Sequence, residues 1–206
     1  RLREFLIAAS RQSRSEMRSS MKIGILAVQG AFAEHEQMLE QLGAEYIELR
    51  KGEDVRQSYD GLILPGGEST VQGKLMRELD MFDTIQSQIK NGMPVLATCA
   101  GAILLARQLS NDAATHLATL PAVVRRNAYG RQLGSFSVDE QIEGIGTFPM
   151  RFIRAPYIEK VLDDTKVLAK VDGNIVMVEN KNQLAMSFHP ELTSDTRIHE
   201  MFLKKI

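Results

Sequence analysis

The sequence lacks the features that would place the chain in a membrane or in an oxidising compartment. Its only cysteine is Cys99, so an intramolecular disulfide is excluded and a reducing cytosol is the expected environment. No apolar run approaches the ~18 residues that a membrane-spanning helix requires. The net charge of −1 provides no bulk attraction to nucleic acid or to an anionic membrane surface. We therefore expect a cytoplasmic protein that binds neither nucleic acid nor membrane.

The first 20 residues differ from the rest in composition. They contain five arginines, five serines and two glutamates, with no glycine or proline. We interpret residues 1–20 as a leader or an added extension, disordered or not native to the chain, with Met21 as the functional start. A targeting peptide is the alternative, but such peptides are poor in acidic residues, and this segment contains Glu4 and Glu16. Residues 21–206 are expected to form one domain.

From Met21 onward, segments typical of strands alternate with segments typical of helices. Short apolar runs predict strands at 22–28, 45–49, 61–64, 94–98 and 183–188, and apolar residues at helical spacing predict helices at 31–42, 69–90, 100–109 and 194–205. Such alternation indicates an α/β fold with a parallel sheet that helices cover on both faces. Shorter strands with turn signals, at 122–126, 132–138, 150–153, 166–171 and 175–179, predict antiparallel additions at an edge.

Cys99 lies between the strand predicted at 94–98 and a helix that begins at Ala100. This is the setting of a nucleophile elbow, a tight strand-to-helix turn that presents a reactive side chain. The small residues Ala97 and Gly101 allow the close packing that such a turn needs. The helix N-terminus favours a thiolate, and its free N–H groups, beginning with that of Ala100, suit a developing oxyanion. A buried structural cysteine is the alternative.

A nucleophilic thiol needs a base, and the chain has four histidines. His35 and His199 fall in helical patterns beside glutamates, so we expect them to be solvated. His116 falls in a polar loop. His189 differs from these three because it follows the apolar run of a predicted strand. Like Cys99, it would lie beyond the carboxyl end of a strand, where sites gather in open α/β sheets.

The residues after His189 complete a catalytic triad pattern. Pro190 disfavours a helix and holds the segment extended, so Glu191 is expected on the same side as His189. A carboxylate there would fix the tautomer of the imidazole and stabilise its protonated form. A strand-end histidine beside a surface glutamate is the alternative when this segment is read alone.

A third candidate element follows the strand predicted at 61–64. Pro65, Gly66 and Gly67 form a turn before the next helix. Two glycines permit backbone geometry that other residues cannot adopt, which suits a backbone N–H aimed at an oxyanion. An ordinary turn explains the glycines equally well in isolation.

Six motifs run in order along the chain from Met21. They are Val28-Gln29-Gly30-Ala31 with Glu34-His35, Pro65-Gly66-Gly67-Glu68-Ser69-Thr70, Thr98-Cys99-Ala100-Gly101, Arg125-Arg126-Asn127 with Gly130-Arg131-Gln132, Phe152-Ile153-Arg154-Ala155-Pro156, and Ser187-Phe188-His189-Pro190-Glu191-Leu192. Together they resemble the class I, triad-type glutamine amidotransferases, and among them the glutaminase subunits of pyridoxal 5′-phosphate synthases. Each motif alone is weak to moderate evidence, whereas six in this order are specific.

The resemblance implies a flavodoxin-like fold and a role for each motif. It implies Cys99 as nucleophile, His189 as base and Glu191 as the acid that orients His189. The other implied roles are oxyanion N–H groups from Gly67 and Ala100, a glutamine-binding set of Gly67, Glu68, Ser69, Arg126, Ile153 and Arg154, and a coupling of Gln29 to partner docking. Neither a metal nor a cofactor is required by this chemistry.

The implied reaction is hydrolysis of L-glutamine to L-glutamate and ammonia. The implied partner is a (β/α)₈-barrel synthase subunit in a large hetero-oligomer, which uses the ammonia to build pyridoxal 5′-phosphate. Three alternatives remain open on the sequence alone. The chain could be a glutaminase that serves another synthase, a cysteine hydrolase of the intracellular peptidase or deglycase type, or a docking subunit with an incidental Cys99.

Overall fold

The computed structural model describes residues 2–126 and 134–206. Its strands are β1 (Lys22–Leu26), β2 (Glu45–Leu49), β3 (Gly61–Leu64), β4 (Val95–Thr98), β5 (Ala106–Leu109), β6 (Leu120–Arg125), β7 (Ser135–Ile142), β8 (Gly146–Ile153), β9 (Tyr157–Val161), β10 (Lys166–Val171), β11 (Asn174–Asn180) and β12 (Gln183–Met186). Its helices are α1 (Leu2–Ser19), α2 (Phe32–Gln41), α3 (Gly52–Val55), α4 (Ser69–Glu78), α5 (Phe82–Lys90), α6 (Ala100–Leu105) and α7 (Arg197–Leu203), with a 3₁₀ turn at Pro190–Leu192. Asn127 and Gly130-Arg131-Gln132 of the sequence motif, and the start of the strand predicted at 132–138, lie outside the described residues.

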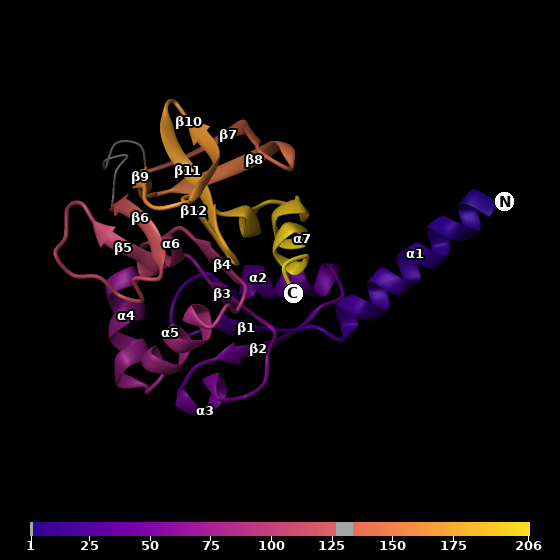
Figure 1. Ribbon diagram of the computed structural model, residues 1–206, viewed down its shortest axis with the longest axis horizontal. Coiled ribbons are helices and arrows are strands. Elements are labelled where there is room, and N and C mark those ends of the chain that lie inside the picture. The colour runs from indigo at the N-terminus through magenta and orange to yellow at the C-terminus, as the bar shows by residue number, and fades with distance from the viewer. Residues whose placement is uncertain (1, 127–133) are drawn as a thin grey trace.

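The described strands form one large sheet and a separate hairpin (Figure 1). The order in the large sheet is β2-β1-β3-β4-β12-β11-β9-β6-β5, with β10 beside β11. Strands β2, β1, β3, β4 and β12 pair in parallel, and antiparallel pairing begins where β11 joins β12. Strands β7 and β8 pair antiparallel with each other. The predicted α/β fold, a mostly parallel sheet with helices and antiparallel additions, is confirmed.

Helices cover both faces of the parallel strands (Figure 1). On β3, Leu62 and Leu64 belong to the apolar core on the side of α4, α5 and α6, whereas Ile63 belongs to the core on the side of α2 and α7. Successive side chains of a strand point to opposite faces. Because both faces are covered, every position of β3 is apolar or glycine, which is why the strand reads as a continuous apolar run.

Two predicted helices are shorter than the sequence pattern indicates. The helix predicted at 69–90 is divided into α4 and α5, because Asp80 between them has a left-handed backbone with a φ of 58°. The helix predicted at 100–109 ends at Leu105, and Ala106 begins β5, which pairs in parallel with β6. Pairing with a neighbouring strand overrides local helix propensity here. Elements α3 and β9 lie in segments where the sequence pattern predicts none.

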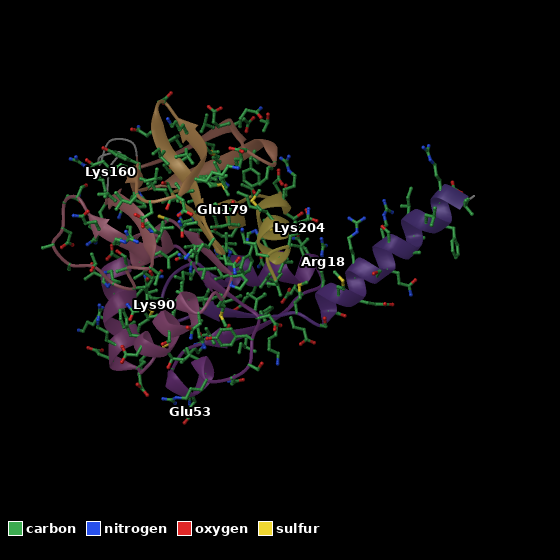
Figure 2. The ribbon with its side chains drawn as sticks, in the orientation of Figure 1. Arg18, Glu53, Lys90, Lys160, Glu179 and Lys204 are labelled. Atoms are coloured by element: carbon green, nitrogen blue, oxygen red, sulfur yellow. The ribbon has the colours of Figure 1, made fainter. Side chains whose placement is uncertain are left out.

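Helix α1 projects away from the rest of the molecule (Figure 1). The structure has a helix where the sequence predicts a disordered extension, since this segment is rich in helix-forming residues and contains no glycine or proline. None of its residues is buried. Arg18 lies where α1 meets the body (Figure 2). Its guanidinium group pairs with Glu200 at 3.1 Å. Among the described residues, no helix combines the length and the apolar character needed to cross a membrane.

We expect a chain that begins at Met21 to have the same free energy of unfolding as the full chain, within about 0.5 kcal/mol. Helix α1 buries no side chain, and its ion pair from Arg18 to Glu200 is partly exposed, a class of contact that contributes about 0–1 kcal/mol. Urea unfolding followed by circular dichroism measures the difference.

A variant in the apolar core gives the loss of stability against which the effect of the deletion is compared. Leu96 on β4 is fully buried, so Leu96→Ala should lower the free energy of unfolding by about 2–5 kcal/mol. A loss of that size on deletion of residues 1–20 would contradict the assignment of the folded domain to residues 21–206.

Candidate active site

The carboxyl ends of three parallel strands meet at one edge of the sheet and surround a pocket. Strand β4 pairs with β3 on one side and with β12 on the other, so the segments that follow these strands lie together. The pocket has a volume of about 430 Å³. It is lined by Ala31, Gly66, Gly67, Glu68, Ser69, Cys99, Ala100, Ile103, Arg126, Ile153, Arg154, His189 and Leu192. The predicted nucleophile, base, oxyanion residues and glutamine-binding residues therefore all border one pocket.

Cys99 occupies a strained turn between β4 and α6. Its φ of 50° lies in the left-handed region, which residues other than glycine rarely adopt. The N–H group of Cys99 donates to the carbonyl oxygen of Met186 at 2.8 Å, which ties the turn to β12. A Cβ atom at Gly101 would lie 2.1 Å from the carbonyl oxygen of Leu64, so α6 can approach β3 this closely only with glycine there. The strand–turn–helix geometry predicted for Cys99 is present.

His189 is held by its main chain and by a buried carboxylate. Its N–H group donates to the carbonyl oxygen of Arg151 at 2.8 Å, and its Nδ1 lies 2.5 Å from Oε1 of Glu191. The side chain of Glu191 is fully buried. The predicted extended conformation is wrong, because Pro190–Leu192 forms a 3₁₀ turn. Proline suits the start of such a turn, since its φ is fixed and it has no N–H group to satisfy.

The surroundings of His189 favour its protonated form. Burial lowers the pKa of His189, but hydrogen bonds with Cys99 and Glu191, together with the charges of both groups, outweigh burial and raise that pKa to about 10. A protonated imidazole in contact with Cys99 stabilises a thiolate there. Chemically, such an arrangement can act as a nucleophile with an adjacent base, which a third group orients.

The turn after β3 is held in place by two glutamines. Oε1 of Gln29 accepts the N–H group of Glu68 at 2.8 Å, and Nε2 of Gln72 donates to the carbonyl oxygens of Gln29 at 3.1 Å and Pro65 at 3.2 Å. Gln72 is a site-supporting residue that the sequence reading missed, although its place one helical turn after Glu68 could have indicated it. A Cβ atom at Gly66 would lie 2.3 Å from Cε1 of His189, so this glycine lets the turn pack against the imidazole.

Two arginines bring positive charge to the pocket. Arg126 pairs with Asp112 at 3.0 Å and donates to Oγ1 of Thr70 at 3.1 Å. Arg154 has a left-handed backbone with a φ of 44°, and its N–H group donates to the carbonyl oxygen of Gly134 at 2.8 Å. Strained conformations of this kind persist where the surroundings fix them. Because guanidinium groups bind carboxylates in a two-pronged geometry, this part of the pocket suits an anionic group.

Two histidines predicted to be solvated are fully buried, so this prediction is wrong. His35 on α2 and His199 on α7 both have 0% exposure, and Nδ1 of His35 lies 2.9 Å from Nε2 of His199. The glutamates next to these histidines suggested a solvated helix face. The helical spacing of the apolar residues, in contrast, indicated that His35 lies on the buried face. His35 comes three residues after Phe32 and four before Leu39, on the helical face that packs against the sheet.

The remaining histidine lies away from Cys99. His116 is next to Arg77, with its Nδ1 3.2 Å from a guanidinium nitrogen, and it does not line the pocket. Within residues 2–126 and 134–206, no group of three or more histidine, cysteine, aspartate or glutamate side chains is arranged to hold a metal ion.

Comparison with known proteins gives consistent matches along the chain. Residues 25–206 match the SNO glutamine amidotransferase family. The chain is similar to the pyridoxal 5′-phosphate synthase subunit PdxT of Desulfitobacterium hafniense, with 63% identity over 90% of this chain and 94% of the relative. It is also similar to PdxT of Streptococcus pneumoniae, with 52% identity over 89% of this chain and 96% of the relative. A crystal structure of a glutamine amidotransferase superposes with a TM-score of 0.84 at 43% identity, covering 89% of this chain and 97% of that one. This chain belongs to the SNO glutamine amidotransferase family.

Proposed function

We propose that the protein is the glutaminase subunit of a pyridoxal 5′-phosphate synthase. It hydrolyses L-glutamine to L-glutamate and ammonia, and it passes the ammonia to a synthase subunit. The observation that carries this proposal is the meeting of Cys99, His189 and Glu191 at one pocket, in a chain whose relatives at 52% and 63% identity are named pyridoxal 5′-phosphate synthase subunits.

In the proposed resting site, the thiol proton of Cys99 has already passed to His189, so the reaction begins from a thiolate beside an imidazolium. The thiolate attacks the side-chain amide carbon of glutamine and forms a tetrahedral oxyanion. His189 then donates its proton to the leaving nitrogen, so ammonia departs and a thioester remains on Cys99. Water activated by His189 hydrolyses this thioester and releases glutamate. The raised pKa of His189, about 10, supports its role as the group that carries the proton between these steps.

The proposed oxyanion site consists of the N–H groups of Gly67 and Ala100. Both residues line the pocket together with Cys99, on the turns that follow β3 and β4. Donors held in place by the backbone of a turn stabilise negative charge as it develops, with no need for reorganisation. Gln29 supports this assignment, because its bond to the N–H group of Glu68 fixes the peptide next to Gly67.

Charge complementarity supports glutamine as the substrate. Arg126 and Arg154 offer positive charge to the α-carboxylate, and Glu68 offers negative charge to the α-ammonium group. Ser69 and Ile153 complete the proposed glutamine-binding set. A volume of about 430 Å³ lies in the range of small-molecule sites.

The proposed partner is a (β/α)₈-barrel synthase subunit within a large cytoplasmic hetero-oligomer. Support comes from the relatives, which are named subunits of pyridoxal 5′-phosphate synthase. We propose that docking of the synthase acts through Gln29. This side chain accepts a hydrogen bond from the turn that carries Gly67, so a displacement of Gln29 would move the oxyanion site.

Cys99→Ala and His189→Asn should each lower glutamine hydrolysis by more than about 10³-fold, because each removes a group that bonds to or protonates the reacting atoms. Ammonia release from glutamine, assayed with the cognate synthase subunit present, measures this loss. His116→Asn is the matched control and should keep the wild-type rate, since His116 lies outside the pocket. Near-full activity in either active-site variant, with a native thermal transition, would refute the triad.

Glu191→Gln should lower kcat by about 10²–10⁴-fold, because Glu191 orients His189 without reacting itself. Loss of the carboxylate also removes a contribution that raises the pKa of His189, so that pKa falls below about 10. The imidazolium would then deprotonate at lower pH, and the alkaline limb of the kcat/KM profile should move to lower pH. An alkaline limb at the wild-type position would show that another residue orients His189.

Hydrolysis by the isolated subunit should be slow and should rise when the synthase subunit is added, if docking completes the oxyanion site. Steady-state ammonia release at saturating glutamine, with and without the synthase, tests this coupling. Equal rates in the two conditions would contradict control of the site by the partner, while leaving the chemistry of Cys99 intact.

A further inference from the structure

A buried pair of histidines lies behind the proposed triad and contacts two of its supports. Nε2 of His35 lies 3.3 Å from Oγ1 of Thr98 and 3.6 Å from Oε2 of Glu191. Its other ring nitrogen, Nδ1, lies 2.9 Å from Nε2 of His199. His35 therefore contacts both the residue that precedes Cys99 and the carboxylate that holds His189.

Both rings of the pair are neutral near pH 7. Burial, together with the nearby His199 and His189, holds the pKa of His35 well below its usual value of 6.5. Burial lowers the pKa of His199 to about 4. A neutral imidazole has one N–H donor and one lone-pair acceptor, so the direction of each bond depends on the tautomer.

One pair of tautomers leaves fewer buried hydrogen-bond donors without an acceptor. If Nε2 of His199 donates to Nδ1 of His35, then the N–H group of His35 points toward Thr98 and Glu191. The reverse tautomers leave a buried N–H group at Nδ1 of His199, for which the described residues provide no acceptor, and turn a lone pair of His35 toward a carboxylate. Orphaned buried N–H groups are rarer than orphaned acceptors, and the lone pair would be repelled. The first arrangement is therefore the stable one.

We propose that His35 and His199 are positioning residues for the reaction, with the N–H group of His35 directed at Oε2 of Glu191 to hold that carboxylate against His189. This inference rests on the proposed glutaminase function. The same N–H group would be shared between Oε2 of Glu191 and Oγ1 of Thr98, so it would also anchor the turn that carries Cys99.

The two carboxylate oxygens of Glu191 differ in their contacts, and one of them needs a hydrogen-bond donor. Oε1 is engaged by His189, whereas Oε2 is buried and has no hydrogen-bond partner among the described residues. An unpaired buried oxygen of a charged group is unfavourable. The 3.6 Å contact with His35 is about 0.4 Å longer than the upper limit of the normal range, so it is a close contact and not a hydrogen bond in this structure. Catalytic hydrogen bonds that are long in the resting protein tighten when the reacting complex forms.

The strained turn at Cys99 needs anchoring for a separate reason. Its left-handed backbone persists only where neighbouring contacts fix it. The hydrogen bond from His35 reaches Thr98, the last residue of β4, immediately before that turn. A single buried ring thus links the strand that carries the nucleophile to the acid that orients the base.

Removal of the N–H group of His35 tests the proposal. His35→Leu should lower kcat for glutamine by about ten- to one-hundred-fold, the loss expected for one hydrogen bond to a charged group, with KM little changed. His35→Gln, whose amide can direct an N–H group to the same place, should recover most of kcat. His116→Leu is the matched control outside the pocket. All variants are assayed as the complex with the synthase subunit.

The outcomes separate this inference from the proposed function. Absence of glutaminase activity in the wild-type complex would refute the proposed function itself. An active wild type with an equally active His35→Leu variant, or a His35→Gln variant as impaired as His35→Leu, would overturn the positioning role.

Nitrogen-15 NMR of the histidine rings in the wild-type protein tests the proposed tautomers even if His35→Leu does not fold. At pH 7 we expect both His35 and His199 to be neutral and protonated on Nε2. Protonation of His35 on Nδ1 would overturn the proposal, because its Nε2 could then donate nothing to Glu191.

Discussion

The parallel pairing of β4 with β3 on one side and β12 on the other is the constraint on which the candidate site depends. Leu64 is in register with Ala97, and Met186 is in register with Thr98, so all three strands end at the same edge. The segments that follow them carry Gly67, Cys99 and His189, which are far apart in the chain. Register alone therefore brings a turn rich in glycine, a thiol and an imidazole to one pocket.

Close packing around these three segments then fixes the positions of their side chains. Glycine at position 101 lets α6 approach the end of β3, and glycine at position 66 lets the neighbouring turn contact the ring of His189. The left-handed backbone of Cys99 is the strained element that these contacts fix. Behind the pocket, the buried Glu191, His35 and His199 form a polar layer. In such a layer each polar group needs a partner, so orientation is tightly specified.

Much of this could be predicted from the sequence because the informative signals are local. The apolar strands, the glycine turn, the strand–cysteine–helix arrangement and the histidine at a strand end are all read from short segments, and order along the chain indicates the family. Signals that depend on tertiary contacts were missed or misread. The conversion of 106–109 to a strand depends on β6, and the burial of His35 depends on the sheet beneath α2. The 3₁₀ turn at Glu191 was also missed, because proline permits either conformation.

The central claim is that Cys99 is the nucleophile of a pocket that recognises glutamine. Reaction with a glutamine analogue that carries an electrophilic carbon in place of the amide, followed by peptide mass spectrometry, tests it most directly. The account predicts one modification, on Cys99, that excess glutamine prevents and that His189→Asn greatly slows. Modification of Cys99 that glutamine does not slow, or that proceeds equally fast in His189→Asn, would contradict it.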